Sequence, residues 1–173
     1  MSESKKDMIL PIVVLTVICI VITAALAFTE QLTTPVIEEA ARKAAEAAKL
    51  EVLPTADSFT EISTEGMPET ITSAFKADNG EGNVFFMTVK GYGGKMKLIC
   101  GIDKDGKISG TKTLEHAETA GLGAKTSEPA YQSQYLGKDE KLEGVDHIGG
   151  ATISSKAFKG AISDAFLALK EVK

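Results

Sequence analysis

An uncharged apolar segment near the N-terminus constrains this chain more than any other feature. Residues 8–29, MILPIVVLTVICIVITAALAFT, contain no charged side chain. A helix over residues 8–28 would have 21 residues. With a rise of about 1.5 Å per residue, it would span the roughly 30 Å hydrocarbon layer of a bilayer. The segment therefore predicts a transmembrane helix in contact with membrane lipid, preceded by a tail of residues 1–7.

The same segment leaves a second interpretation open, a signal sequence that is removed after export. Residues 25–27, Ala-Leu-Ala, have the small side chains of a cleavage site. The apolar run is longer than the ~7–15 residues of an ordinary signal core, which favours a retained anchor. In the alternative, cleavage after Ala27 would release a secreted soluble protein.

Basic residues near the two ends of the span predict its orientation. Lys5 and Lys6 precede the span closely, whereas the first basic residues beyond it are Arg42 and Lys43. The positive-inside rule therefore predicts a single-pass protein of the cell membrane with a cytoplasmic N-terminus and an extracytoplasmic C-terminal domain. Charges ahead of the span cancel, so the net charge of −5 lies in the exported part. An acidic domain without a cluster of Lys and Arg excludes nucleic acid as a partner.

A helical stalk is expected over residues 29–54. Thr34 is a candidate N-cap, and Pro35 suits the first position of a helix. The run that follows is rich in alanine, the residue of highest helix propensity, and Pro54 ends it. Residues 54–80 contain many Thr, Ser, Glu, Gly and Pro residues and predict loops with short extended pieces.

The rest of the chain predicts an α+β fold, with one domain over residues 55–173. Cys100 is expected to be a buried apolar residue without a disulfide partner. A C-terminal helix is expected to begin near Ser154 and to pack its apolar side chains on a sheet, namely Phe158, Ala161, Ile162, Ala165, Phe166 and Leu169. That sheet is predicted as an antiparallel meander of β-branched and aromatic runs separated by glycine-containing turns, at residues 84–92, 96–103 and 107–116.

The glycine-rich stretch GGATIS, residues 149–154, precedes this C-terminal helix. Gly149 and Gly150 permit backbone torsions that other residues avoid, and they let a ligand approach the main chain. The free N–H groups and the positive dipole end of the helix would suit a phosphate, with the Thr152 hydroxyl at the mouth of the site. The same residue types also cap helices. Residue chemistry alone leaves Thr152 open as a helix cap or as part of a phosphate site.

A second glycine-rich stretch, HAETAGLG, occupies residues 116–123. Gly121 and Gly123 flank Leu122, so an apolar side chain would be exposed on a flexible turn with backbone N–H groups beside it. Such a turn can support a flat ring and form hydrogen bonds with its edge. Taken alone, the stretch favours a plain turn, because glycine mostly marks turns.

Together the two stretches resemble the covalent-flavin domains of the G subunit of the Rnf ion-translocating electron-transfer complex and of the C subunit of the sodium-pumping NADH:quinone reductase. In that family, an SGATxT/S motif carries FMN through a phosphoester to its threonine, and an ETPGLG loop lies against the flavin ring. The first motif matches Gly149, Gly150, Ala151, Thr152, Ile153 and Ser154, and the acidic residue ahead of it matches Asp146. The second motif matches Glu118, Thr119, Ala120, Gly121, Leu122 and Gly123.

The resemblance implies a flavoprotein with FMN attached to Thr152. It implies cofactor contacts from both loops, with Leu122 on the ring and polar contacts from Thr119 and Ser155. Serine is usual where this chain has Gly149, and proline is usual where it has Ala120. The full set of implied cofactor-binding residues is Thr152, Gly149, Gly150, Ala151, Ser154, Ser155, Glu118, Thr119, Gly121, Leu122 and Gly123.

The resemblance also implies partners. A separate flavin transferase would use FAD and Mg²⁺ to attach the FMN, and other membrane subunits would complete an Rnf-type ferredoxin:NAD⁺ oxidoreductase. Such a complex couples electron transfer to the export of Na⁺ or H⁺, so this chain would act as a subunit of a translocase. The alternatives are a flavin carrier in another extracytoplasmic electron-transfer chain and an anchored binding or sensor module without flavin.

No catalytic side chain and no metal site are predicted. His116 and His147 are expected to be structural or exposed, because an electron carrier needs no general base. Ligation of a metal by Glu115, His116 and Glu118 is disfavoured, since their spacing matches no ordinary zinc pattern.

Overall fold

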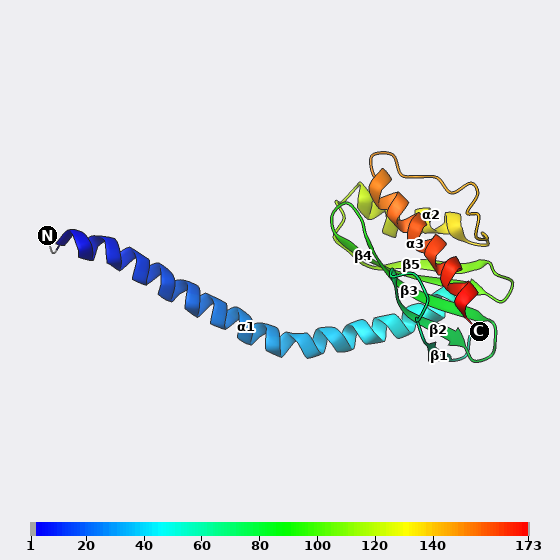
Figure 1. The fold of residues 1–173 in the computed structure, drawn as a ribbon, viewed down its shortest axis with the longest axis horizontal. Coiled ribbons are helices and arrows are strands. Elements are labelled where there is room, and N and C mark those ends of the chain that lie inside the picture. The colour runs from blue at the N-terminus through cyan, green and yellow to red at the C-terminus, as the bar shows by residue number, and fades with distance from the viewer. Residues whose placement is uncertain (1–2, 173) are drawn as a thin grey trace. The chain divides into compact units, whose positions relative to one another are not determined.

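The computed structural model describes residues 3–172, with side chains from Ile9 onward. The described chain forms two compact units, one ending at Ala44 and one beginning at Ala45. Its elements, drawn in Figure 1, are α1 (Glu3–Val52), β1 (Phe59–Ile62), β2 (Ile71–Ala77), β3 (Gly82–Lys90), β4 (Lys95–Asp103), β5 (Ile108–His116), η1 (Gly123–Ser127), α2 (Pro129–Gln132), η2 (Ser133–Tyr135) and α3 (Thr152–Glu171).

Helix α1 is continuous, so the expectation of Thr34 as an N-cap and of Pro35 at a first helical position is wrong. The Thr34 hydroxyl donates to the carbonyl oxygen of Glu30 at 2.8 Å, within the helix. Pro35 lacks an N–H group and leaves one carbonyl of the preceding turn without its usual donor. The apolar run before it and the alanine-rich run after it both favour helix, so the helix continues through this defect. As predicted, the helix ends just before Pro54.

The N-terminal part of α1 has the length and composition of a membrane span. Its most apolar window of 18 residues has a mean hydropathy of 3.0 and no buried residue. Among the described residues, α1 alone is long and apolar enough to cross a bilayer. The boundaries expected for the tail, the span and the stalk remain predictions.

The sheet is an antiparallel meander in the order β1-β2-β3-β4-β5. The last three strands lie within two residues of the predicted runs, and the α+β class is confirmed. Strands β1 and β2 were expected only as short extended pieces among loops. The region is rich in polar residues, but β2 itself has four apolar residues among seven. It buries Ile71 and Ala74 in the core that includes α3, and Ala77 in the core on the other face. Pairing with β3 decides the conformation here, since β propensity depends strongly on neighbours.

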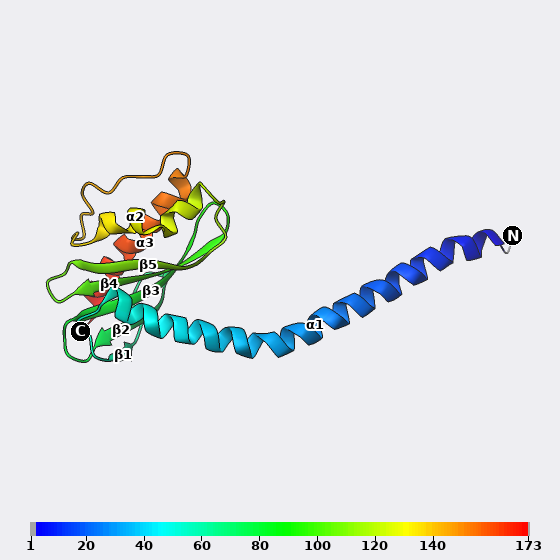
Figure 2. The same ribbon diagram turned by 180° about the vertical axis from the view of Figure 1, so that it is seen from behind.

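Helices cover the two faces of the sheet. Helix α3 lies on one face and buries all the apolar positions predicted for it except the half-buried Leu169 (Figure 1). It begins at Thr152, two residues before the predicted start. On the other face, the last turns of α1 contribute Ala48 and Val52 to a second core, together with Leu53 just after the helix (Figure 2). Cys100 is buried, as predicted, and burial raises the pKa of its thiol.

The end of α1 lies very close to the sheet at two glycines. A Cβ atom on Gly101 would overlap the Val52 carbonyl oxygen, and a Cβ on Gly110 would lie 2.7 Å from the Val52 Cα. The Ser109 hydroxyl donates to the same carbonyl oxygen at 2.6 Å. Glycine at both strand positions therefore lets the helix terminus contact the sheet backbone directly.

Candidate functional site

A cavity of about 420 Å³ opens where three segments of the domain meet. These segments are the β3–β4 turn, the loop that follows β5 and the first turn of α3 with the residues just before it. Its volume lies in the ~300–1,000 Å³ range of small-molecule sites. The lining residues are Tyr92, Glu118, Thr119, Leu122, Gly123, Gly150, Ala151, Thr152, Ile153 and Ser154.

Thr152 is the first residue of α3 and is exposed at this cavity. The residue in the N-cap position is Ala151, and no side chain caps the helix. Within the described residues, the Thr152 hydroxyl has no hydrogen-bond partner, so the interpretation of Thr152 as a helix cap is wrong. The first N–H groups of a helix have no partner within it and form its positive end. Thr152 therefore combines a free hydroxyl with an electropositive helix terminus.

The turn before Thr152 is held by buried Ser155. The Ser155 hydroxyl donates to the Ala151 carbonyl oxygen at 2.9 Å and accepts the N–H of Ile148 at 3.0 Å. Gly150 has a φ of +78°, a conformation that L side chains rarely adopt. Ser155 does not line the cavity, so its two hydrogen bonds position the turn that presents Thr152.

The loop after β5 brings Leu122 to the cavity. Gly121 has a φ of +75°, and the Leu122 N–H donates to the Thr119 carbonyl oxygen at 3.1 Å. This tight turn leaves the Leu122 side chain 46% exposed at the cavity. The turn therefore presents an apolar surface at the cavity, as the sequence predicts.

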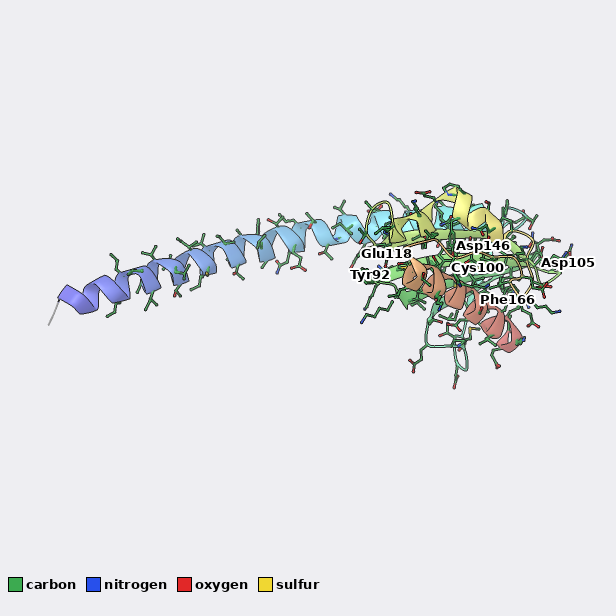
Figure 3. The ribbon with its side chains drawn as sticks, turned by 90° about the horizontal axis from the view of Figure 1, so that it is seen from above. Tyr92, Cys100, Asp105, Glu118, Asp146 and Phe166 are labelled. Carbon is green, nitrogen blue, oxygen red and sulfur yellow. The ribbon has the colours of Figure 1, made fainter. Side chains whose placement is uncertain are left out.

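Glu118 lies at the base of the same loop and is only 8% exposed. One carboxylate oxygen accepts the N–H of Gly93 at 3.0 Å, and the other accepts the Ser154 hydroxyl at 2.6 Å. Figure 3 shows Glu118 beside Tyr92 at one end of the domain. The Glu118 side chain therefore links all three segments that line the cavity.

The structure brings most of the implied cofactor-binding residues together. Glu118, Thr119, Leu122, Gly123, Gly150, Ala151, Thr152 and Ser154 line the cavity. Gly121 and Gly149 belong to the two loops without lining it. Asp146 and His147 are exposed just ahead of GGATIS, and neither lines the cavity. His116 is half-buried and its Nδ1 accepts the Glu118 N–H at 3.2 Å, which is a structural contact. In the described part of the chain, no three His, Cys, Asp or Glu side chains are grouped to hold a metal ion.

Tyr92 is a cavity residue that the sequence patterns did not reveal. Its side chain is 73% exposed on the β3–β4 turn and lines the cavity. An aromatic residue between two glycines, in the stretch GYGG, was the available signal. Only the folding of the meander shows that this turn lies next to the loop after β5.

Comparisons with known proteins match both loops. The FMN-binding domain family matches residues 91–166. The G subunit of the ion-translocating oxidoreductase complex of Methanosarcina acetivorans is 33% identical over 182 residues, which cover 95% of this chain and 95% of that protein. The G subunit of the Na(+)-translocating ferredoxin:NAD(+) oxidoreductase complex of Acetobacterium woodii is 33% identical over 180 residues, covering 87% of this chain and 86% of that protein.

A solved structure is also similar. Shewanella oneidensis NqrC superimposes with a TM-score of 0.49 at 23% sequence identity. The match covers 61% of this chain and 65% of that one, slightly less than two thirds of its length.

Proposed function

This chain belongs to the family of G subunits of ion-translocating oxidoreductase complexes, and on that basis we propose that it relays electrons through FMN linked covalently to Thr152. The resemblance predicted from the two glycine-rich loops is thereby confirmed at the level of the family. The chain is an electron-transfer flavoprotein subunit of such a complex, with a candidate membrane span at its N-terminus.

The free hydroxyl of Thr152 is the observation that carries the proposed attachment. It is exposed at the cavity and has no hydrogen-bond partner within the described residues. A flavin transferase would join this oxygen to the FMN phosphorus of FAD. The phosphoanhydride bond breaks, AMP leaves and the hydroxyl proton is released, so the product is a threonine phosphoester.

The first turn of α3 would stabilise the phosphate group. A phosphodiester keeps one negative charge, and the free N–H groups at a helix N-terminus favour an anion at that point. Gly150 would bring the main chain close to the ligand, because it carries no side chain. The helix N-terminus and the close approach at Gly150 are both features of the backbone. Neither depends on the serine that is usual in the family where this chain has Gly149.

The loop after β5 would hold the flat ring. Leu122 presents an exposed apolar side chain, and Thr119 offers a hydroxyl at the same cavity. Flavin, when bound, accepts electrons from one redox group and passes them to another, while the protein supplies position and electrostatics. The cavity residues would therefore orient the ring and shield one of its faces from water.

The membrane arrangement completes the proposal. The lysines ahead of the span favour a cytoplasmic N-terminus and an extracytoplasmic flavin domain. The partners would be the other membrane subunits of an Rnf-type ferredoxin:NAD⁺ oxidoreductase, the surrounding lipid and the flavin transferase. The coupling ion would be Na⁺ or H⁺, since the complexes of two relatives are described as Na(+)-translocating and proton-translocating.

Intact mass spectrometry tests the attachment. The full chain is expressed with a flavin transferase, alongside Thr152→Ala and Thr152→Ser. We expect the parent and Thr152→Ser to gain the mass of FMN less water, and Thr152→Ala to remain unmodified. A parent that stays unmodified while an SGAT-containing control protein is modified would contradict the proposal.

A further inference from the structure

The Glu118 carboxylate is buried in the floor of the cavity and already has protein partners on both oxygens. These partners are the Gly93 N–H in the β3–β4 turn and the Ser154 hydroxyl in α3. The 2.6 Å distance to the Ser154 oxygen is typical of a hydroxyl that donates to an ionised carboxylate. The geometry thus indicates a negative charge held in place by two donors from different segments.

Two glycines make room for this carboxylate. A Cβ atom on Gly91 would overlap one carboxylate oxygen of Glu118, and a Cβ atom on Gly123 would overlap the other. The Cβ on Gly123 would also lie 2.7 Å from the Ser154 hydroxyl oxygen. The backbone on both sides therefore closes around the Glu118 side chain, which leaves it little freedom to turn toward a ligand.

We propose that Glu118 is a positioning residue. It aligns the three segments that line the flavin site, and its carboxylate places a negative charge at that site. Its carboxylate joins the turn of Tyr92, its own loop with Leu122 and the first turn of α3 with Thr152. The residue thereby sets the separation between the attachment point and the surface that faces the ring. The redox consequence of this inference rests on the proposed function. The connection that Glu118 makes between the three segments is independent of it.

The redox consequence follows from charge. Reduction adds electrons to a flavin, and a nearby buried carboxylate disfavours the added negative charge because charges in a poorly solvated site interact strongly. Glu118 lines the cavity that would hold the ring. The carboxylate therefore lowers the midpoint potential of the bound flavin.

Amide hydrogen exchange tests the connection in the full chain without flavin. Glu118→Ala removes both acceptor oxygens, so neither the Gly93 N–H nor the Ser154 hydroxyl keeps its partner. We expect exchange at the Gly93 amide to become about tenfold faster, as for the loss of one charge-assisted hydrogen bond. The control is Glu115→Ala, which removes an exposed carboxylate on β5 paired with Lys97 at 2.6 Å. Unchanged exchange at Gly93 in Glu118→Ala would overturn the inference.

Potentiometry of the flavin-loaded chain tests the charge. We expect Glu118→Gln to raise the midpoint potential and Glu115→Gln to leave it unchanged. Equal potentials in the parent and Glu118→Gln would overturn the electrostatic role. A parent that takes up no flavin would instead contradict the proposed function, and the exchange experiment would still decide whether Glu118 connects the three segments.

Discussion

The Cδ2 atom of Leu122 lies 3.4 Å from the position that a Cβ atom on Gly150 would take. The two residues are far apart in the sequence, and their contact joins the two glycine-rich loops at one cavity. Glycine at position 150 serves both the left-handed backbone and the close approach of the leucine. The contact places residues of both motifs at the wall of the same cavity.

Gly150→Ala is expected to destabilise the protein and to slow flavin attachment. A φ of +78° costs alanine about 1–2 kcal/mol, whereas the new methyl group would make an ordinary van der Waals contact with Leu122. Thermal unfolding and intact mass over time measure the two effects. Gly149→Ala is the matched control, because a Cβ at that position meets nothing within 4 Å. Equal behaviour of the two variants would contradict the role given to Gly150.

Gly149→Ser restores the serine that is usual in the family's attachment motif. We expect the free energy of unfolding to change by less than about 0.5 kcal/mol, since the position is exposed and has open space around it. We expect faster attachment of FMN to Thr152, because the hydroxyl adds a polar contact for the phosphate or for the transferase. Rates are compared by intact mass after timed reaction with purified transferase and FAD. A rate no higher than that of Gly149→Ala would show that the hydroxyl is dispensable.

Gly110→Ala is expected to destabilise the domain by about 1–3 kcal/mol, the usual cost of overpacking. Its Cβ would lie 2.7 Å from the Val52 Cα, so the end of α1 would have to move off the sheet. Chemical unfolding of the full chain in detergent measures the loss.

Gly160→Ala is the control for that experiment, because it is expected to raise the free energy of unfolding where Gly110→Ala lowers it. Gly160 is exposed within α3, and a Cβ there meets nothing within 4 Å. Alanine should stabilise the helix by about 0.5–1 kcal/mol. A stabilising effect of Gly110→Ala would contradict the close approach of α1 to the sheet.

Alkaline pH is expected to destabilise the domain through Tyr135. Burial raises the pKa of the Tyr135 phenol above its ordinary value of 10.0, and its contact with Tyr131 adds to the shift. Below about pH 10, both folded and unfolded states keep the proton. At higher pH the unfolded state loses it first, so the free energy of unfolding falls by up to about 1.4 kcal/mol per pH unit.

Tyr135→Phe should reduce that dependence on pH. The variant also loses the 3.0 Å hydrogen bond between the two phenols, which should cost about 1 kcal/mol at neutral pH. Urea unfolding at several values from pH 8 to pH 11 measures both effects. The same slope above pH 10 in the parent and the variant would exclude Tyr135 as the cause.

Local patterns in the sequence predicted much of the fold because their physical causes are local. The apolar span, the three β-branched runs and the apolar stripe of the C-terminal helix each follow from spacing and composition. Thr34 and Pro35 suggested a false helix start, because a cap and a proline have the same appearance inside a long helix as at the start of a new one. Strand β2 escaped prediction because the stretch around it is rich in Thr, Ser, Glu, Gly and Pro, and pairing with β3 decides its conformation.

The sequence by itself determined the membrane candidate, the α+β class and the two loops that carry the family resemblance, because each depends on residues close together in the chain. Only the tertiary structure decided that Thr152 has a free hydroxyl, that Ser155 supports the turn and that Tyr92 lies at the cavity. It also decided that Glu118 connects three segments through Gly93 and Ser154. Such contacts join distant residues, and their partners depend on how the strands pair and how α3 packs on them.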